Sequence, residues 1–225
     1  MSIEPILAKF KCPNCSKQFI GHYPPFGIVH DLNHASGVIN SREYFLHLFS
    51  APYLNDYYLC PNCEQLCTAD NVIENKVSIS SENAHLMSAV GSKRSKMWVL
   101  KKLIDEKIFS KYDERSLLLL YWAGVTDDIT SLWLSCASQQ ETVEEKVDSE
   151  KIKRLLSLLD EDKPVERLLK IEILRSQKEF DQAEKLLNFE LSDKELQEVL
   201  EKEKQFLKRK YSLPFIVLER PQIIY

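Results

Sequence analysis

Glycine is scarce in this sequence, which has five glycines in 225 residues and only Gly91 and Gly124 after residue 82. A phosphate-binding loop needs several closely spaced glycines, and no such loop is present. The sequence also has no HExxH pattern, no Ser-His-Asp setting and no paired catalytic carboxylate motif. Together these absences favour a protein that is not an enzyme.

Long apolar runs are also absent. The longest, such as Leu117–Ala123 and Phe215–Leu218, fall far short of the roughly 20 residues that a membrane-spanning helix needs. The N-terminal residues show no charged segment followed by a sustained apolar one, so we expect no signal peptide. We therefore expect a cytoplasmic protein without a membrane partner. Disulfides are rare in that compartment, and paired cysteines there usually hold metal or do redox work.

The composition changes along the chain. Residues 1–75 contain five of the six cysteines, whereas Leu, Lys and Glu dominate after residue 82. We therefore predict a mostly α-helical protein with two domains. Residues 1–80, whose cysteines include two Cys-x-x-Cys pairs at 12–15 and 60–63, are predicted to form a small zinc-ribbon-like module with an aromatic-rich insertion. Residues 81–225 form an all-α region of helical hairpins with an apolar C-terminal tail.

One short pattern occurs twice: "KCPNCSKQF" at residues 11–19 and "LCPNCEQLC" at residues 59–67. A Cys-x-x-Cys turn directs two sulfurs at one point, so two turns supply the four thiolates that tetrahedral Zn²⁺ prefers. The predicted ligands of one structural zinc ion per chain are Cys12, Cys15, Cys60 and Cys63. The alternatives are two independent redox dithiols or four unrelated buried cysteines. A polar, strand-like stretch follows each turn, where a redox motif usually starts a helix, and this favours zinc.

Other ligand types are less well placed. Cys67 follows Cys63 by four residues and can in principle replace one ligand, but the matched pairs already fill four positions, so we expect a small buried thiol. Cys136 lies in an apolar helical stretch and is expected in the core. His30 and His34 have a spacing that suits one helix face. Without a third convincing ligand, a second metal or an acid–base role is disfavoured there.

The 44 residues between the two cysteine pairs are rich in aromatic side chains. These aromatics can line a ligand groove or form the small core of the module, and we favour the core. Residues 41–49 have helical spacing, with Ser41 as the expected N-cap.

Helix signals recur after residue 82. We expect helices over 93–109, 114–124, 126–140, 149–161, 164–179, 180–189 and 193–211. Asp113 is the expected N-cap of the second of these, and Gly124 is expected to end it. Ser192 and Glu195 form the expected capping box of the last.

Phe180, Ala183 and Leu187 have the spacing of the second half of a tetratricopeptide repeat, which this helix pair resembles. The glycine usual at the turn is replaced by residues 177–179. An irregular helical bundle is the alternative.

The whole pattern resembles an uncharacterised bacterial family. The resemblance covers residues 10–72 well, through the split Cys-Pro-x-Cys ribbon and "PYL…YYLCPNC", and the helices loosely. The family usually has Gly-Tyr-Ala after its last cysteine, where this chain has Glu64, Gln65 and Leu66, so kinship is distant. The resemblance implies an architecture and no activity.

The net charge of the chain helps to distinguish a protein partner from a nucleic acid. The chain has a net charge of −4, and residues 1–91 contain five Lys or Arg against eight Asp or Glu. The run Lys93–Lys111 is basic, with seven cations and two acids. Since a phosphate-binding surface needs clustered cations, we expect a non-enzymatic zinc-binding adaptor or scaffold whose partner is another protein. The alternative is a zinc-ribbon nucleic-acid-binding or transcription-associated protein.

The last residues, "SLPFIVLERPQIIY", are too apolar for a solvated terminus. Pro214 and Pro221 prevent a preceding helix from continuing. We expect this tail to fold back as a strand or strap over the chain itself. The alternative is a segment that docks on a partner.

Overall fold

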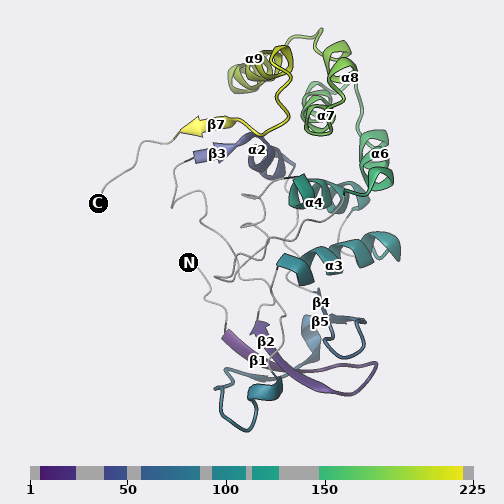
Figure 1. Cartoon of the computed structure of the whole chain (residues 1–225), viewed down its shortest axis with the longest axis vertical. Helices are drawn as coiled ribbons and strands as arrows, with labels where there is room; N and C mark the ends of the chain where they lie inside the picture. Colours follow the sequence, from purple (N-terminus) through teal and green to yellow (C-terminus); the bar gives the residue numbers. More distant parts are fainter. Residues whose placement is uncertain are drawn as a thin grey trace, which may run out of the picture. The chain divides into compact units, whose positions relative to one another are not determined.

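The computed structural model describes residues 6–23, 38–49, 57–86, 93–109, 113–126 and 147–219 (Figure 1). Its strands are β1 (Ile6–Lys11), β2 (Gln18–Tyr23), β3 (Val38–Asn40), β4 (Tyr57–Leu59), β5 (Leu66–Thr68), β6 (Val72–Asn75) and β7 (Ile216–Glu219). Its α-helices are α2 (Ser41–Leu48), α3 (Lys93–Asp105), α4 (Glu114–Thr126), α6 (Ser149–Ser157), α7 (Pro164–Ser176), α8 (Phe180–Lys185) and α9 (Lys194–Lys208). Two 3₁₀ turns are η1 (Ala69–Asn71) and η2 (Ala84–Leu86).

The predicted helical character and the N-terminal cysteine cluster are confirmed. The fold is nevertheless mixed, because β7 lies in the region expected to be all-α. None of the described helices is long and apolar enough to span a membrane. The expected helix over 126–140 lies outside the described residues, apart from Thr126 at the end of α4.

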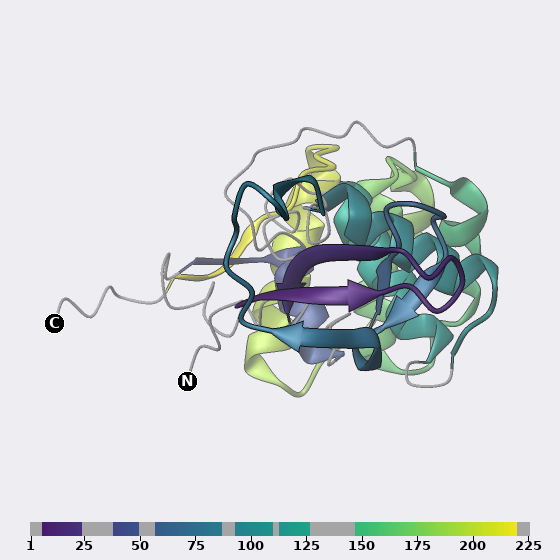
Figure 2. The same ribbon diagram turned by 90° about the horizontal axis from the view of Figure 1, so that it is seen from below.

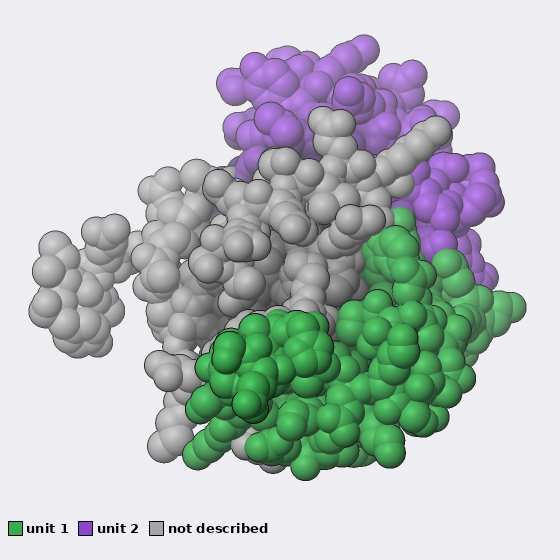
Figure 3. Space-filling model, turned by 60° about the horizontal axis from the view of Figure 1, so that its bottom comes forward, with its two compact units in different colours: residues 1–32, 52–117, 128–145 green, residues 33–51, 118–127, 146–225 purple. Residues whose placement is uncertain are grey.

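The chain divides into two compact units, coloured separately in Figure 3. Unit 1 contains residues 1–32, 52–117 and 128–145, and unit 2 contains residues 33–51, 118–127 and 146–225. Each unit thus combines stretches from both sides of residue 80, where composition suggested one boundary. Residues 33–51 belong to unit 2 because β3 pairs with β7 and α2 packs against α7.

Unit 1 contains two antiparallel sheets. The first has the order β2-β1-β6 (Figure 2), and the second is the β4–β5 hairpin. Phe10 of β1 pairs with Phe19 of β2, and their rings stack with centroids 5.3 Å apart. Tyr58 of β4 packs against both rings. These aromatics are buried together with Cys12 and Cys60, so they form the small core expected of this module.

Helix α3 packs against β4 in the same unit. Met97, Leu100 and Leu103 lie on its buried face, as the apolar spacing predicts. Trp98 is 39% exposed.

Unit 2 contains the helical hairpin of α7 and α8, and α9 packs against both helices. Ala183 of α8 is fully buried, which permits the close helix approach expected from a small side chain. The helix expected over 149–161 has an apolar stripe of Ile152, Leu155, Leu156 and Leu159. Ile152 and Leu155 of α6 are buried, as is Leu159 just after the helix, and Leu156 is half-buried. The tetratricopeptide-like character of the hairpin stays a prediction.

The helix starts confirm one expected cap and correct two. Asp113 Oδ1 accepts the backbone N–H of Ser116 at 2.9 Å, as expected. Asn40, and not Ser41, caps α2: its Oδ1 accepts the N–H of Arg42 at 3.0 Å. Asp193, and not Ser192, caps α9, accepting the N–H of Leu196 at 2.9 Å. In both cases an Asx side chain adjacent to the expected serine accepts the backbone N–H two or three residues on, as N-caps do.

None of the described helices ends at a glycine. Helix α4 continues through Gly124 to Thr126, so the expected end at Gly124 is wrong. Lysine instead takes the left-handed position after three other helices, at Lys107, Lys178 and Lys210, with φ of 54°, 65° and 53°. At each one the lysine N–H and the next residue's N–H donate back to carbonyls of the last turn. This is the hydrogen-bond pattern of a Schellman motif, and a cation there also complements the helix dipole.

The C-terminal tail folds back on unit 2 as far as it is described. We call Ser212–Glu219 the strap. Its strand β7 pairs antiparallel with β3, and Ser41 N–H donates to Phe215 O at 2.7 Å. Arg175 Nη1 donates to the carbonyls of Tyr211 and Leu213 at 2.8 and 2.6 Å. The expected intramolecular fate of the tail is therefore confirmed for these residues.

The strap carbonyls are held by a buried ionic network. Arg175 lies between Glu172 and Glu203, and all three side chains are fully buried. Arg42 of α2 also pairs with Glu172 and donates to Ser212 O at 3.0 Å. One network thus joins α2, α7, α9 and the strap.

The strap should contribute strongly to the stability of unit 2. Phe215 is 4% exposed and packs on Phe206, whereas Leu213 is 72% exposed. We expect Phe215→Ala to lower the free energy of unfolding by about 3–5 kcal/mol, because it removes a buried aromatic side chain. Leu213→Ala, as the matched control, should change it by less than about 0.5 kcal/mol. Urea denaturation followed by circular dichroism measures both, and equal effects would contradict the observed packing.

Candidate metal centre

Each cysteine pair lies in the turn of a hairpin. Cys12 and Cys15 lie between β1 and β2, and Cys60 and Cys63 lie between β4 and β5. The two turns have the same backbone hydrogen bonds. The first cysteine N–H donates to the carbonyl five residues on, at 3.0 Å in both turns, and its carbonyl accepts from the N–H four residues on, at 2.9 Å in both. The repeated sequence therefore encodes a repeated structure.

The residue after each pair adopts a left-handed conformation, with φ of 59° at Ser16 and 55° at Glu64. Glycine adopts this conformation most easily, and other residues pay a steric cost. Both turns accept that cost at the same position, which indicates that the turn geometry is tightly specified.

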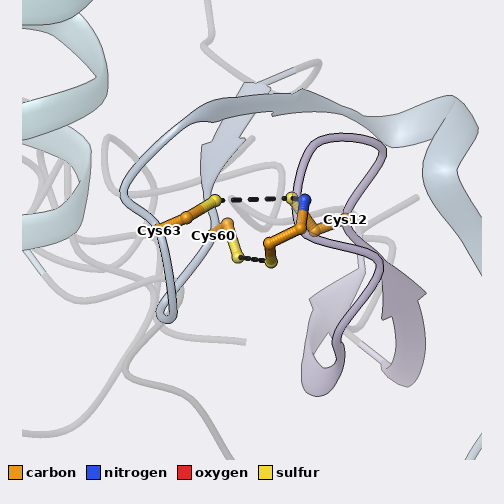
Figure 4. A group of neighbouring side chains, drawn as sticks. Cys12, Cys60 and Cys63 are labelled. Atoms are coloured by element: carbon orange, nitrogen blue, oxygen red, sulfur yellow. Dashed lines mark hydrogen bonds between the residues drawn. The ribbon is translucent and has the colours of Figure 1, made fainter.

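The two turns bring four sulfur atoms together (Figure 4). Cys12 Sγ lies 3.6 Å from Cys63 Sγ, and Cys15 Sγ lies 3.6 Å from Cys60 Sγ. All four sulfurs lie within 4.8 Å of one another, and none of these cysteines forms a disulfide. The predicted ligand residues thus form one cluster that can hold a metal ion, contrary to the alternative of two separate dithiols.

The cluster geometry fits a tetrahedral thiolate site. Sulfurs about 2.3 Å from a zinc ion at tetrahedral corners lie about 3.8 Å from one another. The two closest contacts, at 3.6 Å, are near that value. Because four sulfurs complete a tetrahedron, such a site has no position left for water or substrate.

Hydrogen bonds to the sulfurs favour thiolates at two positions. Asn14 Nδ2 donates to Cys63 Sγ at 3.5 Å, and this contact, with the N–H of Gln65, lowers the pKa of Cys63 to about 6. Burial alone raises the pKa of Cys12, but the N–H groups of Cys15 and Asn14 outweigh it and lower the pKa.

Cys60 differs, because burial raises its pKa to about 12. Binding of a metal ion to this sulfur has to release its proton.

Cys67 is a buried thiol beside the cluster, as expected. It is 2% exposed, and its Sγ lies 3.8 Å from Cys12 Sγ and 3.6 Å from Gln65 O. Burial, followed by the nearby Cys12 sulfur, raises the pKa of Cys67, so this thiol keeps its proton and donates to its neighbours. Cys67 therefore lies beside the four-cysteine cluster and is not part of it.

Two contacts near the centre were missed by the sequence reasoning. Asn14 donates a hydrogen bond to Cys63 of the other turn. The asparagine repeated in both Cys-Pro-Asn-Cys motifs was a sequence signal that could have indicated this contact. Lys102 of α3 donates to Glu64 O at 2.8 Å, which no local pattern indicates. His30, His34 and Cys136 lie outside the described residues.

No protein-family model, curated protein or solved structure matches this chain. The resemblance to an uncharacterised family therefore stays a prediction.

Loss of one cluster cysteine should release the metal. We expect the purified protein to carry one zinc ion per chain and Cys60→Ser to lose it, because structural zinc contributes on the order of 10 kcal/mol of apparent binding free energy in small modules. Cys67→Ser is the matched control, since it removes a neighbouring buried thiol, and should retain the metal. Elemental analysis with circular dichroism measures both. Folded wild-type protein without metal, or metal loss only in Cys67→Ser, would contradict the assignment.

The left-handed position at Ser16 gives a test of the turn geometry. Ser16→Gly should raise the free energy of unfolding of the metal-loaded protein by about 0.5–1 kcal/mol, because glycine relieves the steric cost. Ser157→Gly, at an exposed helical position of α6, should lower it by about the same amount. Thermal unfolding at constant free zinc compares the two variants. The same sign for both would show that Ser16 is not strained.

Proposed function

We propose that Cys12, Cys15, Cys60 and Cys63 hold one structural Zn²⁺ ion in a cytoplasmic, non-enzymatic adaptor protein. The observation that carries the metal part is the four-sulfur cluster, in which both turns have matching hydrogen bonds. Zinc suits four sulfur ligands in a closed tetrahedral site. The metal then stabilises a module whose own apolar core is small.

The chemistry of a four-thiolate site supports a non-enzymatic adaptor. A site closed by four thiolates stabilises structure and does not activate water. The most deeply buried charged side chains, in the network around Arg175, contact one another and the strap, which is a structural arrangement. Helical hairpins such as α7–α8 commonly present surfaces to other proteins.

Nucleic-acid binding is the competing function, and the basic run on α3 bears on it. Lys102 donates to Glu64 O and pairs with Glu106 at 3.6 Å, so its charge is directed into contacts within unit 1. With a net charge of −4 for the whole chain, a protein partner is favoured over a phosphate backbone.

Affinity purification of the native complex tests this function. Tagged full-length protein and its Cys60→Ser variant are recovered from nuclease-treated and untreated lysates of the native host. We expect a protein that co-purifies with the wild type in both lysates and is lost with the variant. A partner lost on nuclease treatment would reverse the ranking. So would binding to random single-stranded DNA that weakens steeply with added salt.

A further inference from the structure

A hollow in unit 1 lies between the second cysteine turn and helix α3. Its volume is about 700 Å³, within the range of ligand and peptide pockets. Leu59 and Trp98 give it an apolar wall, and residues 63–65 of the cysteine turn line the other side. The hollow therefore combines an exposed aromatic ring with a wall that belongs to the candidate metal centre.

The spacing of α3 explains why this face is open. Trp98, Lys101, Lys102 and Asp105 are three or four residues apart, so they share one helix face. Buried side chains of the same helix anchor it in unit 1: Met97, Val99, Leu100 and Leu103. The face that carries Trp98 is thus displayed by a helix whose other side is fixed.

Lys102 fixes the two walls of the hollow to each other. Its ammonium group donates to Glu64 O at 2.8 Å and to Gln65 Oε1 at 3.5 Å, and pairs with Glu106 at 3.6 Å. Glu64 O belongs to a residue whose left-handed conformation is set by the cysteine turn. The shape of the hollow therefore depends on the same turn that supplies Cys63 to the metal centre.

The charges around the hollow favour a cationic occupant. Glu64, Asp105 and Glu106 supply three carboxylates, against the two ammonium groups of Lys101 and Lys102. Lys102 and Glu106 pair with each other, so their charges offset, and among the remaining charges of the lining two carboxylates, of Glu64 and Asp105, face one ammonium group, of Lys101. A guanidinium group is attracted both to the aromatic ring and to the carboxylates of this lining, because it can stack on an indole and form forked hydrogen bonds to a carboxylate.

We propose that this hollow binds an arginine-bearing peptide segment of the partner protein. The guanidinium lies over Trp98 and pairs with the carboxylate of Glu64, and an apolar neighbour in the peptide packs on Leu59. This rests on the proposed adaptor function and names the chemistry of its partner.

A peptide selection with the full-length, zinc-loaded protein tests the proposal. A random octapeptide library displayed on phage is selected on the wild type and, in parallel, on Trp98→Ala. We expect wild-type-dependent clones to be enriched in arginine together with an apolar residue. Synthetic copies of these peptides should bind Trp98→Ala at least about tenfold more weakly, the effect of losing a cation–π contact of roughly 1.4 kcal/mol.

Charge and position controls make the result specific. Glu64→Gln should weaken binding several-fold, while Glu150→Gln, an exposed glutamate of unit 2, should leave it unchanged. Replacing the arginine of the peptide by lysine should weaken binding, because lysine lacks the planar fork. Zinc content and circular dichroism of each variant establish that it is folded.

Three results would overturn the proposal: no Trp98-dependent clones, enrichment of acidic peptides, or Trp98-dependent binding of a single-stranded oligonucleotide in place of peptides. The adaptor function has its own readout. If Trp98→Ala still recovers the nuclease-resistant partner from the lysate, the function stands and the hollow is not its binding site. If the wild type recovers no partner, the adaptor function itself fails.

Discussion

The convergence of four sulfur atoms is the constraint on which unit 1 depends. Four thiolates at these separations would repel one another, and a bound divalent cation would offset that repulsion by attracting all four. The β4–β5 hairpin has only three residues in each strand and is not expected to be stable alone in water. The stacked rings of Phe10 and Phe19 pack in the same cluster as Cys12 and Cys60. The cysteine cluster and the apolar core are thus one structure, and we expect a change in either to affect both.

Unit 2 depends on a different constraint, the buried network around Arg175. Burial and the charge of Glu172 raise the pKa of Glu203 well above its ordinary value. Burial also opposes the charge of Glu172, but Arg175, Glu203 and Arg42 outweigh it and lower the pKa of Glu172. Arg175 also donates to the carbonyls of Tyr211 and Leu213, and Arg42 donates to the carbonyl of Ser212. Because a buried guanidinium without acceptors is costly, these carbonyls fix the path of the strap.

The sequence predicts features that depend on near neighbours along the chain. The two cysteine pairs, the α6 stripe and the Asp113 cap are local patterns, and the structure has them where expected. The pairing of β3 with β7 joins residues more than 170 positions apart, and neither short strand signals its partner. Arg175 and Glu203 likewise resemble the exposed charges of any amphipathic helix. Their burial follows from the tertiary packing of α2, α7, α9 and the strap, which no local pattern contains.

Because glycine is scarce, the sequence does not indicate which residues adopt the left-handed conformation in turns and at helix ends. Among the residues that the structure describes, six other than glycine have positive φ, and four of them are lysines: Lys76, Lys107, Lys178 and Lys210. Three of these lysines follow helices, where the exposed carbonyls of the last turn favour a cation. The chain thus uses charge complementarity at helix ends where many proteins use the conformational freedom of glycine. At Ser16 and Glu64 no helix dipole is present to offset the steric cost. Each of these residues directly follows the second cysteine of its turn, so we expect metal binding at the four-sulfur cluster to offset the steric cost.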